Sequence, residues 1–455
     1  MSTAFWTFDR IAEALASEAA ATLPTGSAAL HGVSTDTRTI ASGDLFVALK
    51  GERHDAHDHL AEAVAKGAAA LVVSDAARAE GAAVPAYRVR DTLRALGALG
   101  RHRRRAWGKR VVGVTGSNGK TSTKELLRAA LGGRFRVHAT QGNLNNQIGV
   151  PLTLLALPDD AEIAVVEMGT SLPGEIALLR AIAEPQIAMV TSVAEAHLEL
   201  LGSLDGVRRE KSAIYDGVEI GVVPATEPGV LELARPRAKR VVVAGLGAGE
   251  LRASRWGSSP DASAGWLEVD GVRVEVPLRG EHNLRNAMLA LAAARECGIA
   301  LADAARGIAA MKPPSMRLAA EPLGRATLIN DAYNANPGST RAAIDLLAAM
   351  PGDRQRVLVL GTMRELGAGS AALHEEIARR ALASSIDVVA GIGAFAGPLA
   401  RDGDERAVTG EDVDDLWARL APRLARDAVI LLKASRGVRL ERLVPHLTSW
   451  AAHPD

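Results

Sequence analysis

The chain has 455 residues, more than one ordinary hydrophobic core accommodates, and a usual domain size of about 100 to 200 residues suggests roughly three domains. It carries 53 Lys plus Arg and 53 Asp plus Glu residues, so no excess charge favours a nucleic acid or a membrane surface as partner. A small molecule is therefore the expected class of ligand.

The first residues do not resemble a targeting signal. Asp9, Arg10 and Glu13 interrupt the apolar positions, and no apolar stretch of the chain approaches the roughly 20 residues that span a bilayer. The single cysteine, Cys297, lies in an Ala/Leu-rich segment, where a buried apolar role is a simpler interpretation than a reactive thiol. We expect a cytoplasmic protein without membrane insertion.

The first hundred residues contain short apolar runs at 45–49 and 71–73, followed by a helix that we expect to begin near Asp91. These elements predict a small α/β domain over residues 1–98. The basic run 101–105 falls on this helix, where five such residues are more typical of a solvated face than of an anion site.

A second series of short apolar runs alternates with helical segments over residues 99–313. Repeated strand–helix units predict a mostly parallel sheet. Residues 266–276 alternate in polarity around Asp270-Gly271, which predicts a hairpin. The expected strands are 111–114, 163–166, 187–190, 220–223 and 241–244.

A third series predicts a smaller α/β domain over residues 314–455, after a hinge at Lys312-Pro313-Pro314. The expected strands are 327–329, 357–360, 388–392 and 429–432, and the expected helices are 339–350, 373–384 and 413–420.

A glycine-rich turn follows the strand at 111–115 and precedes a helix that ends near Gly132. Such a turn directs backbone N–H groups inward, the helix N-terminus adds partial positive charge, and Lys120 adds a full charge for β- and γ-phosphates. Val114 stands where the first glycine of the usual motif belongs, so an ordinary glycine-rich turn is the alternative. The expected nucleotide-binding residues are Thr115, Gly116, Ser117, Asn118, Gly119, Lys120, Thr121 and Ser122.

Polar residues follow two of the predicted central strands. Glu167 ends one, Thr191 follows the next, and His197 comes shortly afterwards. Strand ends of a parallel sheet open into a crevice, where a carboxylate, an imidazole and the Thr121 hydroxyl could hold Mg²⁺ together with phosphate oxygens. Taken alone, His197 is equally well interpreted as a structural histidine.

Together these motifs resemble the Mur ligase family of peptidoglycan synthesis, and within it the branch that adds a dipeptide. The resemblance extends over all three predicted domains. Its signatures are Thr115-Gly-Ser-Asn-Gly-Lys-Thr121, Glu167-Met-Gly-Thr-Ser171, Ala196-His-Leu-Glu199, Glu210-Lys-Ser-Ala-Ile214, Gly280-Glu-His-Asn283 with Asn286, Asp331-Ala-Tyr-Asn-Ala-Asn-Pro337, Gly142-Asn-Leu-Asn-Asn-Gln-Ile-Gly-Val-Pro151, Ser34-Thr-Asp-Thr-Arg38 and Gly43-Asp-Leu-Phe-Val-Ala-Leu49.

The resemblance implies a UDP-sugar-binding N-terminal domain, a central P-loop domain and a Rossmann-like C-terminal domain that binds nucleotide and incoming dipeptide. It implies an ATP-dependent ligase, with Mg²⁺, that joins D-Ala-D-Ala to UDP-N-acetylmuramoyl-tripeptide (UDP-MurNAc-tripeptide) through an acyl phosphate. We expect a monomer.

The resemblance also implies roles for individual residues. Lys120, Glu167, His197 and Lys211 are the expected catalytic residues, and the expected metal ligands are Thr121, Glu167, His197 and, if it is carbamylated, Lys211. From the residue alone, a surface lysine is the simpler interpretation of Lys211. Further nucleotide contacts are expected from His282, Asn283, Asn286, Arg317, Asp331, Tyr333 and Asn336. Substrate contacts are expected from Ser34, Asp36, Thr37, Arg38, Phe46, Asn143, Asn145, Asn146, Thr170, Ser171, Lys433, Ser435 and Arg436.

Other interpretations stay open at this point. Asn283 also fits a helix N-cap, and Ser192, Thr362 and Ala434 depart from the family's usual Asn, Asp and Gly. The chain could be a sibling ligase that adds another amino acid, a folylpolyglutamate-synthetase-like ligase, a P-loop switch without catalysis, or an inactive homologue that acts as a partner. A switch would lack the UDP-sugar segments, and an inactive homologue would have no need of the catalytic residues.

Overall fold

The computed structural model describes residues 5–314, 316–401 and 403–452. The chain forms two compact units. The first comprises Met1–Gly113, Arg136–Gly169 and Glu175–Gln186, and the second comprises Val114–Phe135, Thr170–Gly174 and Ile187–Asp455.

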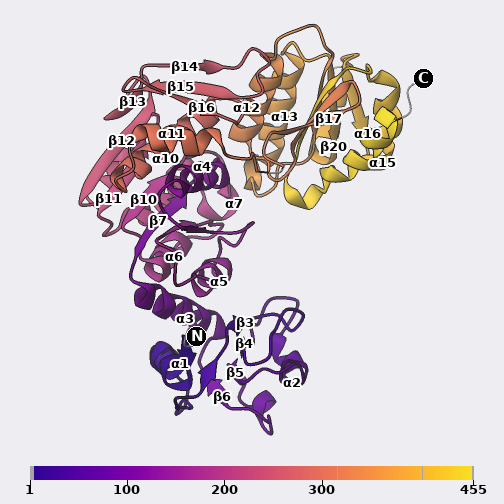
Figure 1. Ribbon diagram of the computed structural model, residues 1–455. Coiled ribbons are helices and arrows are strands. Elements are labelled where there is room, and N and C mark those ends of the chain that lie inside the picture. The colour runs from indigo at the N-terminus through magenta and orange to yellow at the C-terminus, as the bar shows by residue number, and fades with distance from the viewer. Residues whose placement is uncertain (1–4, 315, 402, 453–455) are drawn as a thin grey trace. The chain divides into compact units, whose positions relative to one another are not determined.

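The first unit contains a four-stranded parallel sheet in the order β3-β4-β5-β6. Successive residues of its strands face opposite sides, so Val72 packs toward α1 and α3 whereas its neighbour Leu71 packs toward α2. Figure 1 shows these helices on the two faces of the sheet. The elements are α1 (Phe8–Leu15), β3 (Val33–Ser34), β4 (Leu45–Val47), α2 (Leu60–Ala65), β5 (Ala70–Val73), β6 (Ala86–Arg88) and α3 (Thr92–Trp107), with the pair β1 (Trp6–Thr7) and β2 (Ala29–Leu30) beside them.

The rest of this unit packs against α3, which begins directly after its N-cap Asp91 as expected. Gly100 of α3 allows a close approach to α5, because a Cβ there would lie 2.9 Å from the Pro151 Cα. The remaining elements are β8 (Val137–Ala139), α5 (Gly149–Leu155), β9 (Ile163–Glu167) and α6 (Glu175–Ala183), with β8 and β9 parallel.

The basic run of α3 is only partly the solvated face that the sequence predicts. Arg103 and Arg104 are buried: Arg103 donates to the Leu157 carbonyl oxygen at 2.6 Å, and Arg104 donates to the Ala183 carbonyl oxygen at 2.8 Å. The expectation was wrong for these two residues because α3 packs against α5 and α6. The carbonyl groups that accept from the arginines lie at or just after the C-terminal ends of these two helices.

The second unit begins within β7 (Arg110–Thr115), which runs across the division between the units. Four parallel strands, β10 to β13, follow in sequence order, and α4, α10 and α11 pack together beside them. Cys297 is buried at the end of α10, which confirms its predicted burial. The elements are α4 (Lys120–Gly132), β10 (Ile187–Val190), α7 (Leu198–Leu201), α8 (Leu204–Ser212), β11 (Ile220–Pro224), α9 (Pro228–Ala234), β12 (Arg240–Leu246), β13 (Leu251–Ala253), α10 (Glu281–Glu296) and α11 (Leu301–Ala309).

An antiparallel three-stranded sheet, β14-β15-β16, contains the predicted hairpin. Asp270 and Gly271 have φ values of 49° and 77°, which are the left-handed conformations that a two-residue type I′ turn requires. The strands are β14 (Arg255–Ser258), β15 (Gly265–Val269) and β16 (Val272–Val276).

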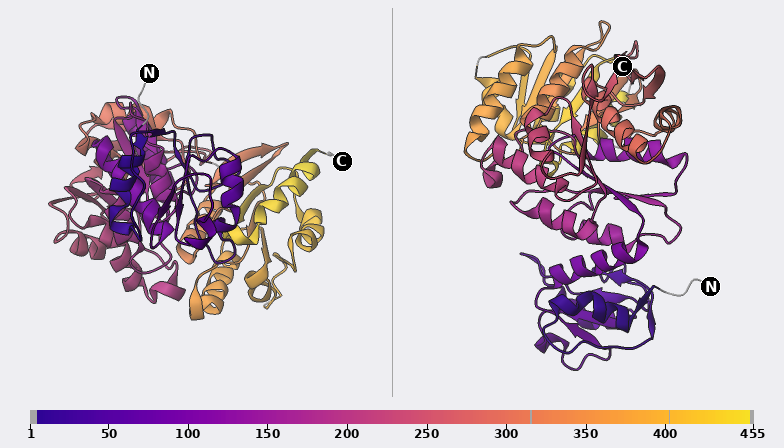
Figure 2. Two further views of the ribbon diagram at one scale, coloured as in Figure 1. Left: turned by 90° about the horizontal axis from the view of Figure 1, so that it is seen from below. Right: turned by 90° about the vertical axis from the view of Figure 1, so that its left-hand side faces the viewer.

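The C-terminal part of the second unit is built on a six-stranded sheet in the order β17-β18-β22-β19-β20-β21, parallel except for the edge strand β17. Helices α12 and α13 cover one face, and α15 and α16 cover the other (Figures 1 and 2). The elements are β17 (Ala319–Leu323), β18 (Ala326–Asp331), α12 (Pro337–Ala348), β19 (Arg356–Leu360), α13 (Ser370–Leu382), β20 (Val388–Ile392), α14 (Ala396–Ala400), β21 (Ala407–Gly410), α15 (Val413–Leu420), β22 (Val429–Lys433) and α16 (Leu443–Ala452).

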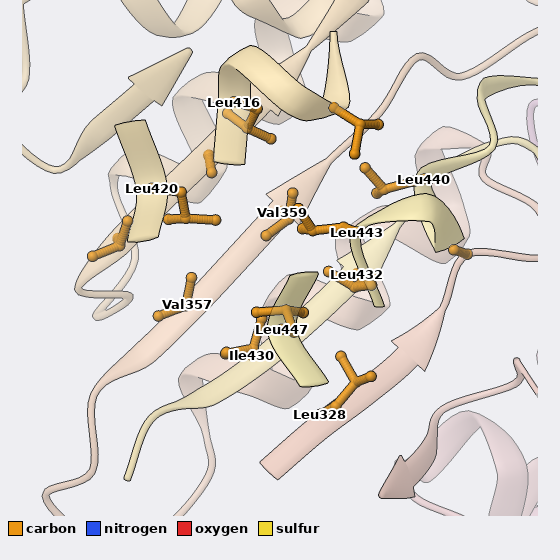
Figure 3. Close-up of a cluster of buried hydrophobic side chains, with 14 of the residues drawn as sticks. Leu328, Val357, Val359, Leu416, Leu420, Ile430, Leu432, Leu440, Leu443 and Leu447 are labelled. Atoms are coloured by element: carbon orange, nitrogen blue, oxygen red, sulfur yellow. The ribbon is translucent and has the colours of Figure 1, made fainter. Parts of the chain in front are cut away.

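One face of this sheet forms a continuous apolar layer. In Figure 3, Val357, Val359, Ile430 and Leu432 of two central strands point toward Leu416 and other side chains of the covering helices. All of these residues are buried, because a parallel sheet covered on both faces leaves neither face to water.

The predicted α/β class with mostly parallel sheets is confirmed, and every strand expected from an apolar run is present. Among the described residues, no helix is both long enough and apolar enough to cross a membrane.

Candidate active site

The phosphate-loop sequence forms a tight turn between β7 and α4, and two glycines make it possible. Gly116 has φ 151°, and a Cβ there would lie 1.9 Å from the Thr191 Oγ1. Gly119 has φ 80°, and a Cβ there would lie 2.7 Å from the Asn286 Oδ1. Neither position has room for a side chain, and Gly119 also adopts a conformation that favours glycine.

The segment that follows β10, residues 192–194, is hydrogen-bonded to this loop. The backbone N–H of Ser117 donates to the Ser192 carbonyl oxygen at 2.8 Å, and the backbone N–H of Asn118 donates to the Ser192 Oγ at 3.1 Å. The Ala194 N–H donates to the Ser117 Oγ at 2.9 Å. Ser192 therefore supports the loop directly. Although the family usually has asparagine at this position, serine still accepts hydrogen bonds from Ser117 and Asn118.

The loop ends where α4 begins, at Lys120. The Lys120 Nζ donates to the Gly116 carbonyl oxygen at 2.8 Å, which holds the ammonium group against the turn. Thr121 and Ser122 occupy the next positions of the first helical turn, where the helix dipole favours anions. The turn formed by residues 116–119, called the cradle, has no room for a Cβ at either glycine and has Lys120 at its edge. Such a turn fits a chain of phosphates.

Residues from the C-terminal part of the second unit reach this loop. The Asn118 Nδ2 donates to the Asn336 Oδ1 at 3.2 Å, and the Asn336 Nδ2 donates back to the Asn118 Oδ1 at 2.7 Å. The Arg317 Nη2 lies 3.4 Å from the Thr121 Oγ1, and its guanidinium stacks 4.2 Å above the centre of the Tyr333 ring. The structure thus brings together Asn118, Thr121, Arg317, Tyr333 and Asn336, all of which the sequence assigns to nucleotide binding.

Asp331 lies at the end of β18 and is engaged by a lysine. The Lys433 Nζ lies 2.7 Å from the Asp331 Oδ2 and donates to the Asn334 carbonyl oxygen at 2.7 Å. Burial lowers the pKa of Lys433, although the carboxylate of Asp331 acts in the opposite direction. The same carboxylate acts on His282, whose pKa burial lowers to about 4. His282 is therefore neutral at physiological pH.

Asn283 and Asn286 lie on one face of α10, as their spacing predicts. The Asn286 Nδ2 donates to the Asn283 Oδ1 at 3.1 Å, and both side chains are buried. Gly280 is the N-cap of α10, so the alternative interpretation of Asn283 as an N-cap was wrong. Its Nδ2 instead donates back to the Arg279 carbonyl oxygen at 2.8 Å, which leaves Asn286 facing the Gly119 turn.

His197 contacts a residue that the sequence did not single out. Its Nδ1 is hydrogen-bonded to the Glu365 Oε2. Both residues have positive φ, 56° and 65°, a conformation that is costly outside glycine and concentrates at functional sites. No motif marks Glu365, because its contact arises from folding of the C-terminal sheet next to the loop that carries His197.

Lys211 is fully buried in α8, so the surface-lysine interpretation was wrong. Burial and the positive charge of Lys120 lower the pKa of the Lys211 amine well below its usual value. The preceding Glu210 accepts from the Gly174 N–H at 2.7 Å and from the Thr170 hydroxyl at 3.4 Å. Ser171 follows Thr170 in this segment and is half-buried.

Glu167 belongs to the first unit, whereas Thr121, His197 and Lys211 belong to the second. Within its unit, Glu167 is buried at the end of β9, and the Asn145 Nδ2 donates to its Oε1 at 2.8 Å. Among the described residues, no three His, Cys, Asp or Glu side chains gather around a possible metal position. The magnesium site expected from the sequence therefore stays a prediction.

The other expected substrate residues of the first unit lie on two segments. Asn146 accepts from the Gly149 N–H at 2.9 Å, and the exposed Asn143 lies in the same loop. Arg38 lies beside Asp36 in a two-point ion pair and lowers the pKa of that carboxyl group to about 2. The remaining residues there are Ser34 and Thr37 in the same turn, and Phe46, which is buried in the core. Their contacts with substrate stay predictions.

A cavity of about 200 Å³ lies beside the His197–Glu365 pair and is lined by Asn336, Ser435 and Arg436 among others. The Ser435 hydroxyl donates to the Ala335 carbonyl oxygen at 3.2 Å and is buried. The sequence predicted Asn336, Ser435 and Arg436 but missed Arg364 and Glu365, which also line the cavity.

Two departures from the family pattern lie next to this cavity. The Thr362 hydroxyl oxygen accepts from the Ala394 N–H at 3.0 Å, so it has a structural role at the end of β20. Ala434 is buried and does not have a positive φ, so it requires no glycine.

Three family models match the chain. The model described as Mur ligase middle domain matches residues 114–294, the model described as Mur ligase, glutamate ligase domain matches residues 316–436, and the model described as Mur ligase family, catalytic domain matches residues 29–104.

Individual proteins are similar along almost their whole length. The UDP-N-acetylmuramoyl-tripeptide–D-alanyl-D-alanine ligase of Bacillus subtilis is 38% identical over 432 residues, covering 92% of this chain and 93% of the relative. The crystal structure of MurF from Acinetobacter baumannii has a TM-score of 0.89 at 31% identity, covering 98% and 99% of the two chains. MurF ligase from Thermotoga maritima, solved in complex with ADP, has a TM-score of 0.82 at 28% identity, covering 92% and 98%.

Proposed function

This chain belongs to the Mur ligase family, and on that premise we propose that it joins D-Ala-D-Ala to UDP-MurNAc-tripeptide with consumption of ATP. The observation that carries the proposal is the contact between the phosphate loop and the C-terminal residues Asn336 and Arg317. A loop for phosphates alone would suit any nucleotide-binding protein. A ligase also needs a binding site for the incoming amine, and a C-terminal lobe in contact with the loop supports the presence of such a site.

In the first step, the carboxylate of the tripeptide attacks the γ-phosphoryl group of ATP. The bond between the γ-phosphorus and the bridging oxygen breaks, so that an acyl phosphate forms and ADP leaves. Phosphoryl transfer depends mainly on positioning and on charge neutralisation. Lys120, at the edge of the cradle, supplies positive charge to the transferring group, and the N–H groups at the start of α4 hold phosphate oxygens. Arg317 is placed to add charge from the C-terminal lobe.

The residues expected to hold a metal offer few ligand atoms, which suits Mg²⁺ better than a metal that takes many protein ligands. Mg²⁺ keeps several waters and uses one or two carboxylates together with substrate phosphates. Thr121, Glu167 and His197 would hold it, with Lys211 if carbamylated. When bound, the ion neutralises the developing phosphate charge. The neutral amine that burial favours at Lys211 is the form that reacts with carbon dioxide.

In the second step, the neutral amine of D-Ala-D-Ala attacks the acyl phosphate, and collapse of the tetrahedral intermediate releases phosphate. Water competes with this amine, so the site has to exclude it. The Asn118–Asn336 pair supports the proposal that the C-terminal lobe covers the loop during this step.

Phosphate release tests the function directly. The purified protein is supplied with Mg²⁺, ATP, UDP-MurNAc-tripeptide and D-Ala-D-Ala, and each component is omitted in turn. Dependence on all of them supports the proposal, and Lys120→Ala should abolish both turnover and ATP binding. Release that requires a different amino acid in place of the dipeptide would identify a sibling ligase instead.

We propose the same three-domain boundaries as the sequence suggests, 1–98, 99–313 and 314–455, and a cytoplasmic monomer. The near-complete coverage of the relatives' chains supports three domains of family type. Light scattering checks the monomer, since a mass near twice 47.5 kDa would contradict it.

A further inference from the structure

The cavity beside His197 combines opposite charges with small wall residues. Two guanidinium groups, Arg364 and Arg436, and one carboxylate, Glu365, line it, together with Ala196 and Ala335. Its volume of about 200 Å³ suits a molecule of the size of a short peptide rather than a nucleotide. Its walls therefore favour a small ligand that carries charge.

The two arginines are engaged differently. Arg436 lies 3.0 Å from the Glu441 Oε1 and contacts the Met316 Sδ, so its charge already has a carboxylate partner. Arg364 donates to the Gly437 carbonyl oxygen at 3.2 Å, and, together with the hydrogen bond from His197, its charge contributes to the lowered pKa of the neighbouring Glu365 carboxyl group. Within the part of the chain that the structure describes, Arg364 forms no ion pair as close as that of Arg436. Since a guanidinium group has five N–H donors, Arg364 retains capacity for an anion.

Arg364 is held in place by the turn after β22. Its backbone N–H donates to the Ser435 Oγ at 3.0 Å, and its side chain lies against Gly437. A Cβ at residue 437 would lie 2.5 Å from the Arg364 Nη1, so glycine there allows the guanidinium to lie against the backbone. A side chain fixed before binding loses less conformational entropy when a ligand arrives.

The cavity also adjoins the phosphate loop. Asn336 and His197 line it, and Asn336 is hydrogen-bonded to Asn118 of the loop. A ligand in the cavity would therefore lie between Arg364 and a residue that contacts the phosphate loop.

We propose that Arg364 binds the C-terminal carboxylate of the incoming dipeptide and so determines specificity for a free carboxylate. This inference rests on the proposed ligase function and adds a residue to it. An arginine matches a carboxylate in a two-point, charge-assisted contact, and the small residues Ala196 and Ala335 leave room for the methyl side chains of alanine. The amine end then points toward the phosphate loop.

The test compares D-Ala-D-Ala with D-alanyl-D-alanine amide, which lacks the carboxylate. In wild-type protein, we expect the amide to show a KM about 10- to 100-fold higher, the range for loss of a hydrogen bond to a charged group. Arg364→Ala should raise the KM for D-Ala-D-Ala by a similar factor and leave the KM for the amide unchanged. The KM values for ATP and UDP-MurNAc-tripeptide should not change.

Two further variants separate carboxylate binding from a general structural effect. Arg364→Lys keeps the charge and should retain part of the preference for the carboxylate. Gly437→Ala keeps Arg364 but should displace it, with a rise in the same KM. Arg419→Ala is the matched control, because Arg419 is an exposed arginine of α15 that pairs with Asp415.

The assignment of Arg364 is overturned if Arg364→Ala raises the KM values for D-Ala-D-Ala and for its amide equally, or raises neither. In that case, phosphate release by the wild-type protein still supports the ligase function. Absence of dipeptide-dependent phosphate release in the wild-type protein overturns the proposed function and this inference together. A wild-type protein that uses the amide as well as D-Ala-D-Ala overturns the inference alone.

Discussion

The paired amides of Asn118 and Asn336 are the most direct link between the phosphate loop and the C-terminal sheet. Replacing either residue with alanine removes both hydrogen bonds, at 3.2 and 2.7 Å. Asn336→Ala also removes the N-cap of α12, since its Oδ1 accepts from the Ser339 N–H at 2.9 Å. The two single substitutions therefore differ in what else they disturb.

A double-mutant cycle isolates the pair, because the loss of the cap cancels in the coupling energy. Each hydrogen bond contributes about 0.5 to 1.5 kcal/mol net, so the coupling should be roughly 1 to 3 kcal/mol. Because 1.4 kcal/mol corresponds to a factor of about ten, the double variant should be about 5- to 150-fold more active than independent effects would give.

The assay is kcat/KM for ATP in phosphate release, measured for the wild type, both single variants and the double variant. A control cycle combines Asn118→Ala with Asp412→Ala. Asp412 is the N-cap of α15, which packs on the same C-terminal sheet. The Asp412→Ala substitution therefore removes a comparable helix cap and leaves the Asn118–Asn336 pair intact. Its effects should be independent of those of Asn118→Ala.

Independent effects in the Asn118–Asn336 cycle, within a factor of about two, would refute the reasoning. That result would mean that the amide pair does not hold the loop in the active conformation. The C-terminal lobe would then need another contact to cover the site, such as the one between Arg317 and Thr121.

Three other predictions concern single residues. Gly119→Ala should weaken ATP binding at least about tenfold in calorimetry, because its Cβ would meet the Asn286 amide at 2.7 Å in a left-handed turn; unchanged affinity would contradict the geometry of the cradle. Asn145→Ala removes the donor to Glu167 and should shift the Mg²⁺ dependence of phosphate release upward about 10- to 100-fold, so an unaltered Mg²⁺ titration would rule out a metal-positioning role. Burial lowers the pKa of His282 to about 4, below the usual value of about 6.5, so between these values the unfolded chain binds more protons and stability should fall on acidification. Urea midpoints at pH 7 and pH 5 should differ less in His282→Gln than in the wild type, and an equal difference would argue against this shift.

The phosphate loop could be located from the sequence because its information is local. A strand, a turn with two glycines and a helix follow each other within 111–132, and the structure has this order. The same holds for strands such as β9 and β22, whose apolar runs are continuous because both faces of the sheet are covered. The edge strand β21 was missed, since its four residues are only partly buried and give a weak pattern.

Other properties depend on neighbours that are distant in the chain. A lysine at position 211 reads as a surface residue, yet it is buried, because the packing of α8 decides its environment. Arg103 and Arg104 likewise become buried where α5 and α6 supply carbonyl acceptors. Burial and partner choice are set by these long-range contacts, which no short window of sequence contains.

The sequence by itself determined the α/β class, the phosphate loop and the family resemblance, because strand patterns, glycine turns and motif spacings are properties of neighbouring residues. Only the tertiary structure decided that Asn118 meets Asn336, that His197 meets Glu365 and that Arg364 lies against Gly437 beside a cavity. These partners are separated by 73 or more positions in the chain, so their contact exists only once the sheets and their covering helices have packed.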